Sequence, residues 1–318
     1  MFKLFKIRTF GDYISDTFQF IKVYGKHYFK NYFKFAFIAL LILMVAIAMI
    51  ATFYSRIFAT SMGGFGDVET FDNNFVSENA VMLIIGFIAI IITILYLSLL
   101  NYSYPVYYLK LLGENTASKP DLSQIKLQFK KDLGRLILFG FISIIVFGAV
   151  GIVTVGIATI LTFLLIGLLL LPIIIPFITT WYTLTLYYYL NENEGFFGAL
   201  HSSFQTITKN FWAIIGANLC VLLIVYIINT AITLIPYIFV LIGFISGMQN
   251  PESLENFESS SLSLYMTLMM VVYCVALISG LILNHLTLIQ VGLVYYSDRE
   301  DTEQFTLRQS IEEIGAND

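Results

Sequence analysis

The chain has 318 residues, of which 58% are hydrophobic and 12% are charged, and its mean hydropathy is +0.83. Soluble domains carry about 25% charged residues, so this composition excludes an aqueous globular protein and a disordered chain. The two cysteines lie in apolar runs, which excludes a disulfide scaffold. A net charge of −4 offers no basic excess to attract nucleic acid. We therefore expect an all-α integral membrane protein that does not bind nucleic acid.

Long apolar segments recur along the chain and predict six transmembrane helices, because a bilayer core of about 30 Å needs about 20 apolar residues in a helix. The spans are expected at about 35–54, 80–102, two within 136–190 with a turn near Gly156, 212–233 and 264–296. The apolar segment 236–247 either extends the fifth helix or forms a re-entrant or interfacial piece. These spans define a polytopic membrane protein.

The placement of Lys and Arg predicts the orientation. With six spans, every basic residue except Arg56 falls on one side, which is then the cytoplasmic side and holds both termini. The loops on the other side are acidic, and we interpret them as solvated loops. Their acidic residues are Asp67, Glu69, Asp72, Glu252, Glu255 and Glu258.

An internal repeat divides the chain into three tandem hairpins, each with an amphipathic segment, two spans and a tyrosine-rich exit. The repeat units cover about residues 10–115, 120–195 and 196–300, and a cytoplasmic tail follows at 301–318. The amphipathic segments place apolar residues three and four positions apart, a pattern typical of helices in the headgroup plane. We expect one membrane domain over 1–318, with interfacial helices on its cytoplasmic side.

Two groups of residues in this repeat are expected to contact the membrane surface. The exits carry tyrosines, which we interpret as anchors with the ring at the interface and the hydroxyl in water. These are Tyr104, Tyr107, Tyr108, Tyr187, Tyr188, Tyr189, Tyr295 and Tyr296. Lys126, Lys130 and Lys131 in the second amphipathic segment are expected to contact anionic lipid headgroups, at about 1 kcal/mol per charge. The tail segment from Phe305 to Ile311 looks like the start of a fourth amphipathic helix.

The stretch from Gly198 to Gly216 resembles an element of bacterial six-span proteins. In that element an Ala and a Ser on an interfacial helix precede a Phe-Trp pair at the next span, here Phe211-Trp212. The families are the membrane domain of some glycerophosphoryl diester phosphodiesterases and the YciC-like proteins. The resemblance implies a multi-pass protein of the bacterial cytoplasmic (inner) membrane with a link to lipids. It does not imply phosphodiesterase activity, because the chain has no room for that catalytic domain.

The sequence contains no pattern that indicates catalysis. It has no Gly-rich phosphate loop, no nucleophile elbow, and no Cys or His cluster with metal-ligand spacing. No Asp, Glu, Lys or Arg lies at mid-depth in a span, where proton-coupled transporters and intramembrane proteases carry such groups. We therefore expect no enzymatic activity, no cofactor, no catalytic residue and no metal site.

Uncharged polar residues and prolines inside the spans form the candidate intramembrane site. Asn284 and His285 lie near mid-depth of the sixth span, where a polar residue marks a candidate site. The alternative is a neutral histidine that a neighbouring helix satisfies. Asn218 is interpreted as a cross-helix packing contact worth about 0.6–2 kcal/mol. Pro172 and Pro176 break the fourth span and resemble the broken helices of transporters, although static bundles also contain such kinks.

The leading hypothesis is a non-enzymatic inner-membrane protein that serves as a scaffold or accessory subunit of a membrane complex. Its partners are then membrane lipids and another membrane protein or a second copy of the chain. The alternative is a translocator of a lipid or small amphiphile, and a membrane enzyme that uses His285 is a third hypothesis. A cavity lined by Pro172, Asn218 and His285 is expected for transport, whereas a densely packed bundle is expected for a scaffold.

Overall fold

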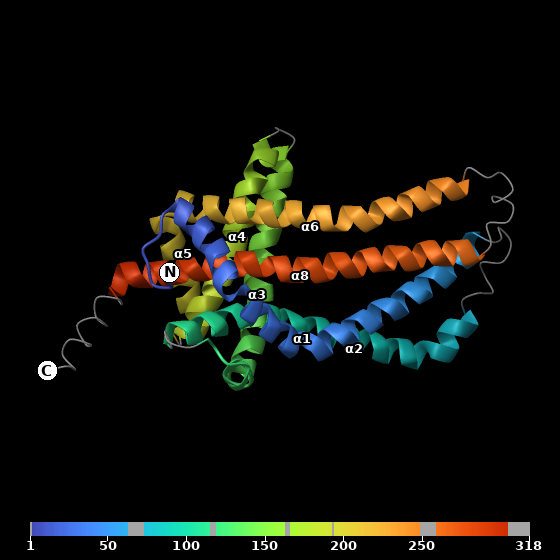
Figure 1. Cartoon of the computed structure of the whole chain (residues 1–318), viewed down its shortest axis with the longest axis horizontal. Coiled ribbons are helices and arrows are strands. Elements are labelled where there is room, and N and C mark those ends of the chain that lie inside the picture. The colour runs from blue at the N-terminus through green and yellow to red at the C-terminus, as the bar shows by residue number, and fades with distance from the viewer. Residues whose placement is uncertain are drawn as a thin grey trace. The chain divides into compact units, whose positions relative to one another are not determined.

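The computed structural model describes residues 2–62, 73–114, 119–162, 166–192, 194–248 and 259–304, and every regular element in them is an α-helix (Figure 1). The helices are α1 (Phe10–Met62), α2 (Asn73–Glu114), α3 (Leu122–Thr162), α4 (Ile166–Asn191), α5 (Phe196–Lys209), α6 (Phe211–Met248) and α8 (Ser259–Glu303). Six segments are long and apolar enough to cross a membrane: Phe10–Ile47, Ile84–Glu114, Leu122–Thr162, Leu170–Asn191, Phe211–Ile238 and Val271–Glu303. The chain is an all-α multi-pass membrane protein, which confirms the fold class predicted from composition.

One helix boundary differs from the sequence-based expectation, and another decides between two alternatives that the sequence left open. The turn predicted near Gly156 is wrong, because α3 continues through this residue to Thr162 and α4 begins at Ile166. A glycine inside a helix costs about 1 kcal/mol relative to alanine, whereas unpaired backbone groups in hydrocarbon cost several times more. The helix therefore continues through Gly156. In the fifth span, α6 continues through Pro236, so the apolar segment after it extends this helix.

The amphipathic segments dock on the protein by one face. In α1 and α3 they run into the following span without a break, and only α5 is a separate helix, which ends at Asn210. Each segment buries two residues four positions apart, as one face of a helix requires. The buried pairs are Asp16–Phe20, Ile125–Phe129 and Ser203–Ile207.

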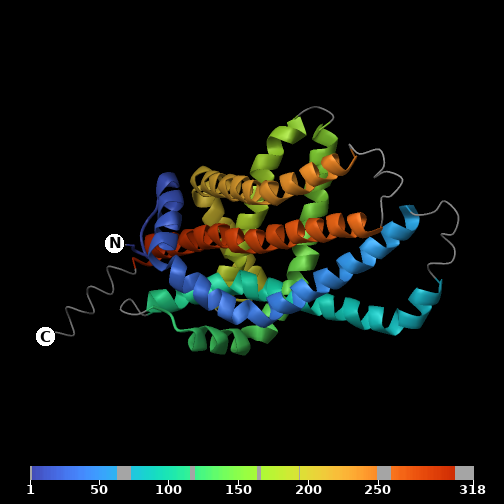
Figure 2. The same ribbon diagram turned by 45° about the vertical axis from the view of Figure 1, so that its right-hand side comes forward.

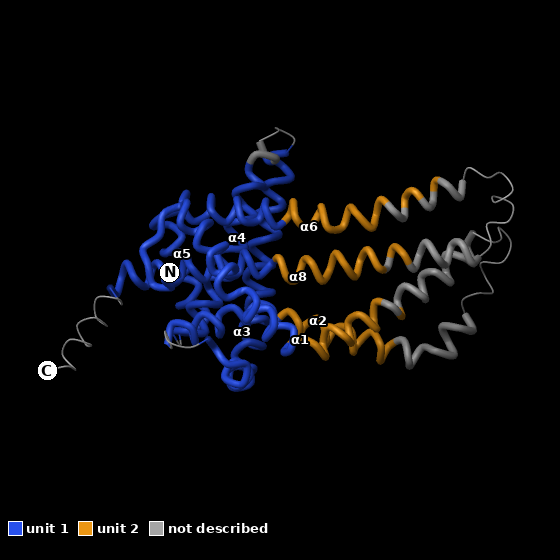
Figure 3. Tube along the Cα trace, in the orientation of Figure 1, with its two compact units in different colours: residues 1–35, 99–225, 284–318 blue, residues 36–98, 226–283 orange. Residues whose placement is uncertain are grey.

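The chain divides into two compact units (Figure 3). Unit 1 comprises residues 1–35, 99–225 and 284–318, and unit 2 comprises residues 36–98 and 226–283. Within unit 1, α4 packs on both α3 and α5. The α3–α4 hairpin runs across this unit's segments of α6 and α8 in both views (Figures 1 and 2). All residues of the sites described below belong to unit 1.

The tyrosine-rich exits form part of the core of unit 1, so the prediction of water-facing anchors is wrong. All eight exit tyrosines named above are buried. Six of their hydroxyls form hydrogen bonds with protein groups in the described part of the chain, as when Tyr104 donates to the Tyr28 carbonyl at 2.7 Å and Tyr188 donates to Asp298 Oδ2 at 2.6 Å. Because the exits pack against one another, the rings fill the space between helices and find hydrogen-bond partners there.

A glycine allows three helices to meet in this tyrosine core. A Cβ atom on Gly292 of α8 would collide with the Tyr187 hydroxyl of α4 and lie 2.6 Å from Leu109 Cδ1 of α2. Contacts this short do not occur between real side chains, so only glycine fits here. The close approach also brings the Tyr187 hydroxyl to the Leu288 carbonyl, at 3.2 Å.

Some predicted features lie outside the described residues. These are the acidic loop residues Asp67, Glu69, Asp72, Glu252, Glu255 and Glu258, and the tail segment from Phe305 to Ile311.

Candidate functional site

A partly open cavity of about 260 Å³ lies among the membrane-spanning segments of α2, α3, α4, α6 and α8 in unit 1. Its polar lining consists of Tyr102, Thr179, Tyr182, Thr183, Asn284 and Thr287, and no charged residue lines it. Small-molecule pockets typically measure about 300–1,000 Å³. This cavity is therefore large enough for one polar head group or ring, but not for a whole membrane lipid.

Five of these polar side chains have no hydrogen-bond partner within the described part of the chain. They are Tyr102, Tyr182, Thr183, Asn284 and Thr287. The Thr287 hydroxyl is fully buried as well as unpaired. Threonine hydroxyls inside helices usually bond to a carbonyl of the preceding turn. Thr93 and Thr154 do so, each to the carbonyl four residues earlier, at 2.8 and 2.7 Å. The unpaired Thr183 and Thr287 hydroxyls thus depart from the pattern of these threonines, although buried groups without a partner among the described residues also occur away from the cavity, at Ser143, Asn191 and Gln290.

The second proline of α4, Pro176, meets Asn218 of α6 beside the cavity. The Asn218 amide donates to the Pro176 carbonyl at 3.2 Å, to the Thr179 hydroxyl at 3.4 Å and to the Thr180 hydroxyl. The structure therefore brings Pro176 and Asn218 together, and Asn218 makes the cross-helix contact expected of it. Pro172 is exposed and does not line the cavity.

Asn284 and His285 are neighbours in sequence but belong to different environments. Successive residues of a helix point about 100° apart. Asn284 lines the cavity, whereas His285 is fully buried among aromatic rings of α1 and α2. The Tyr28 hydroxyl lies 2.7 Å from His285 Nδ1, and the Tyr32 ring centroid lies 4.4 Å from the imidazole centroid. His285 Nε2 has no partner among the described residues. Packing thus separates the pair that the sequence proposed as one site.

The cavity found is not the one that the sequence anticipated. None of Pro172, Asn218 and His285 lines it, although Asn218 holds the wall residue Thr179. Sequence reasoning found Asn284 and missed the other polar lining residues. On α8 the three-residue spacing of Asn284 and Thr287 was a usable signal, since it places both on one helix face. Nothing in the local sequence linked that face to the cavity-lining residues of α4.

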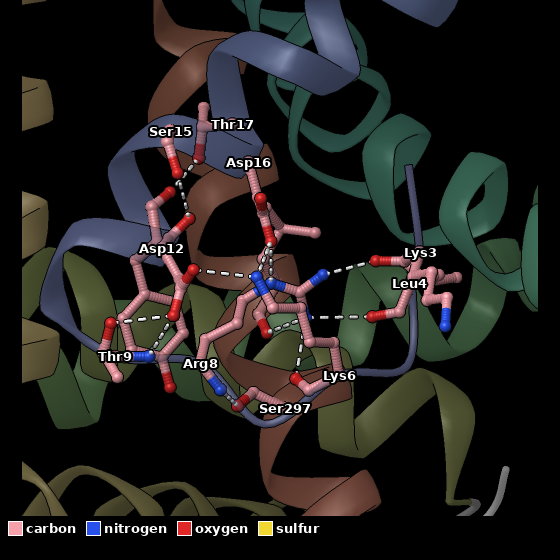
Figure 4. A network of polar contacts seen from close by, with 12 residues as sticks. Lys3, Leu4, Lys6, Arg8, Thr9, Asp12, Ser15, Asp16, Thr17 and Ser297 are labelled. Carbon is pink, nitrogen blue, oxygen red and sulfur yellow. Dashed lines mark hydrogen bonds and ion pairs between the residues drawn. The ribbon is translucent and has the colours of Figure 1, made fainter. Parts of the chain in front are cut away.

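A second polar cluster fixes the N-terminal segment to α1 and α8 (Figure 4). Arg8 is buried, and its Nε donates to Asp16 Oδ2 at 3.0 Å. Its Nη1 donates to the Leu4 carbonyl at 2.9 Å and to the Leu293 carbonyl at 3.4 Å. The backbone amide of Arg8 donates to the Ser297 hydroxyl at 2.9 Å. Arg8, which the sequence counted only as a topology signal, is thus the centre of a structural network.

Charges in this cluster are paired. Burial lowers the pKa of the Arg8 guanidinium, and the neighbouring Asp16 carboxylate opposes that shift. The guanidinium stays protonated, as arginine does in proteins. Lys6 Nζ lies 2.8 Å from Asp12 Oδ1 and 3.4 Å from Asp16 Oδ2, and the hydrogen bond to Asp12 raises the pKa of Lys6. Because its groups already have partners, we assign this cluster a structural role.

The three lysines predicted to contact lipid headgroups lie on an exposed face of α3. Lys126, Lys130 and Lys131 are exposed, and Leu127 beside them is 70% exposed. Lys126 Nζ also lies 5.6 Å from the Phe35 ring centroid. An exposed basic face with an apolar side chain among the lysines suits a membrane surface.

Within the described ranges, no group of three or more His, Cys, Asp or Glu residues could hold a metal ion. Comparisons of the chain with protein-family models, with curated proteins and with solved structures give no match. The similarity of the Gly198–Gly216 stretch to YciC-like proteins therefore stays a prediction. The candidate functional site is the uncharged cavity with its unpaired polar groups.

Proposed function

We propose that the protein is a non-enzymatic translocator of an uncharged amphiphile, which it takes from the bilayer into the cavity around Asn284 and Thr287. The observation that carries this proposal is the group of unpaired polar side chains around an uncharged cavity. A buried polar group without a partner costs about 1–3 kcal/mol. Among the lining residues the Thr287 hydroxyl is such a group, while the polar atoms of Tyr102, Tyr182, Thr183 and Asn284 are not fully buried, so a ligand in the cavity can supply their partners.

The lining supports an uncharged ligand. Hydroxyl and amide groups can bind a hydroxyl, an ester or a carbonyl, but they do not neutralise a phosphate. Moving an unpaired charge into a low-dielectric site is strongly unfavourable. Phosphate-binding sites normally supply Arg or Lys, and neither lines this cavity. The apolar lining residues Ile178, Leu222 and Leu288 suit the hydrocarbon part of an amphiphile.

The position of the cavity supports movement across the bilayer. Asn284 and Thr287 lie near the middle of the 33-residue segment Val271–Glu303. One wall belongs to α4, whose two prolines each remove a backbone hydrogen bond just before the wall residues begin. Transporters use interrupted helices beside mid-membrane sites in this way. The Lys and Arg distribution supports an orientation with both termini cytoplasmic, and the resemblance of the Gly198–Gly216 stretch supports a bacterial inner-membrane location.

The first test is to identify what co-purifies with the protein. The tagged wild type and an Asn284→Leu/Thr287→Val variant are purified from native membranes in mild detergent, and bound lipids and proteins are identified by mass spectrometry. We expect one uncharged amphiphile enriched on the wild type and reduced about tenfold or more on the variant, since tenfold corresponds to about 1.4 kcal/mol. Thr154→Val is the matched control, because the Thr154 hydroxyl bonds to its own helix and does not line the cavity.

Two results would contradict the proposal. One is equal recovery of the same lipids from the wild type and both variants. The other is a stoichiometric protein partner with no enriched lipid, which would favour the scaffold or accessory-subunit role predicted from the sequence. For a protein that passes this test, reconstituted vesicles should show movement of the identified amphiphile between leaflets, slower with the cavity variant than with Thr154→Val.

A further inference from the structure

We infer that the cavity binds the head group of a lipid-soluble quinone, a flat ring with two carbonyl oxygens and an apolar tail. This inference rests on the proposed function and names its ligand class. It concerns recognition of the ring. Three properties of the lining support it: an aromatic wall, neutral hydrogen-bond donors on more than one helix, and a volume suited to one substituted ring.

The aromatic wall comes from three helices. Tyr102 of α2, Phe147 of α3 and Tyr182 of α4 all line the cavity. The Tyr102 and Tyr182 ring centroids are 5.2 Å apart, those of Phe147 and Tyr182 are 5.3 Å apart, and both pairs meet edge to face. A flat unsaturated ring packs well against such rings, in offset or edge-to-face geometry. The glycerol backbone of a neutral glycerolipid has no flat ring to use this wall.

The hydrogen-bond chemistry also fits a quinone. The oxygens of a quinone only accept hydrogen bonds, and the unpaired groups at the cavity include neutral donors. Tyr182 and Thr183 supply hydroxyls from α4, while Asn284 supplies an amide from α8. Because the donors lie on two helices, a ring with carbonyls on opposite sides can accept from both. A glycerolipid carries its polar groups at one end.

The size and the absence of charge agree with this ligand. A volume of about 260 Å³ accommodates a single substituted ring and leaves a long tail outside the partly open cavity. Exposed apolar residues on the flanking helices, such as Ile144 and Leu223, offer that tail a hydrocarbon environment. No carboxylate, lysine or arginine lines the cavity, which matches a neutral ring.

The chain contains a natural reporter for this site. It has two tryptophans, Trp181 and Trp212. The Trp181 ring centroid lies 5.4 Å from that of the cavity residue Phe147, and its indole donates to the Leu200 carbonyl at 3.1 Å. Trp212 is 72% exposed and does not line the cavity. Replacing it, Trp212→Phe, therefore leaves one tryptophan, beside the proposed site.

The experiment titrates decyl-benzoquinone into detergent-solubilised Trp212→Phe protein and follows tryptophan fluorescence, which quinones quench on close approach. We expect saturable quenching of Trp181. Adding Asn284→Leu and Thr287→Val should raise the concentration at half-saturation about tenfold, the effect of about 1.4 kcal/mol. Adding Thr154→Val should leave it unchanged. Diacylglycerol is tested in parallel, as a competitor of the quinone and as a ligand by mass spectrometry.

The outcomes separate the two proposals. Quenching that is linear and equal in all variants overturns the quinone assignment. If diacylglycerol binds and the cavity variant loses it, while the quinone does not bind, the quinone assignment fails and the uncharged-amphiphile function stands. If neither compound binds and no uncharged amphiphile co-purifies, both proposals fail. Saturable quinone binding that only the cavity variant weakens supports both.

Discussion

The Arg8 network and the cavity are both polar regions of unit 1, yet their polar groups differ in whether they have partners. Every nitrogen of Arg8 donates at least one hydrogen bond to the protein. Around the cavity, Asn284, Thr183 and Thr287 have no partner in the described residues. A polar group with protein partners stabilises the fold, whereas one without a partner is available to a ligand. The difference predicts opposite responses to mutation.

The largest effect is expected from removing the arginine at the centre of the paired region. Arg8→Ala should lower the free energy of unfolding by about 3–5 kcal/mol, because it removes the closer of the two cations that pair with the buried Asp16 and leaves only the half-exposed Lys6 at 3.4 Å. Thermal or denaturant unfolding in detergent measures this. Lys6→Ala is the control, since its side chain is 39% exposed and such pairs contribute about 1 kcal/mol or less. Equal small losses for both variants would show that Arg8 is not the centre of the network.

A smaller loss should follow from filling the close approach in the tyrosine core. Gly292→Ala inserts a methyl group against Tyr187 and Leu109, and overpacking of this kind costs about 1–3 kcal/mol. The unfolding midpoint should fall. Gly151→Ala is the matched control, since a Cβ atom there meets nothing within 4 Å. We expect it to leave stability unchanged or raise it by up to about 1 kcal/mol. A Gly292→Ala protein as stable as the control would contradict the packed arrangement.

Asn218 has features of both regions, because its amide nitrogen donates to Thr179 at the cavity wall while its Oδ1 has no partner among the described residues. Asn218→Leu should cost about 0.6–2 kcal/mol of stability, the range for cross-helix hydrogen bonds in membranes. It should also weaken ligand binding, since Thr179 and the proline break lose their support. Full stability together with unchanged binding would show that Asn218 supports neither the helix contact nor the cavity wall.

The cavity threonines should give the opposite pattern to Arg8. Thr183→Val removes an unpaired hydroxyl from a buried residue and keeps the side-chain volume, so stability should stay unchanged or rise by up to about 1–3 kcal/mol. Ligand binding should weaken by a factor of about 2–10, the effect of one hydrogen bond of about 0.5–1.5 kcal/mol. Unfolding curves and the Trp181 quenching titration measure the two quantities on the same protein. A large stability loss with unchanged binding would mean that Thr183 is a structural residue.

The smallest effect is expected from salt. Because no charged residue lines the cavity, the dissociation constant for the uncharged ligand should be the same at 0.05 and 0.5 M NaCl, although about 0.1 M salt already screens exposed charges beyond about 10 Å. Binding to anionic vesicles through Lys126, Lys130 and Lys131 should weaken over the same range. Strong salt dependence of ligand binding would indicate a charged ligand.

The sequence predicted the parts of this molecule that depend on local composition. Runs of apolar residues long enough to cross a bilayer predicted the helical class and the six spans. Periodicity identified the amphipathic segments as helices, but not which face each one buries, since Asp16 and Ser203 are buried while Phe18 and Phe204 are exposed. Local patterns predicted less where the outcome depends on neighbours, as at Gly156, where an uninterrupted α3 replaced the expected turn.

Tertiary structure alone decided which polar residues became a site. Asn284 and His285 look equivalent in sequence. In the folded protein Asn284 lines the cavity, whereas His285 is buried against Tyr28. The exit tyrosines are amphipathic enough for an interface, but the convergence of α2, α4 and α8 made them core residues. The number of consecutive apolar residues is a property of one segment, and the amino-acid sequence shows it directly. Hydrogen-bond pairing and cavity lining depend on which helices lie side by side, and only the folded bundle determines that.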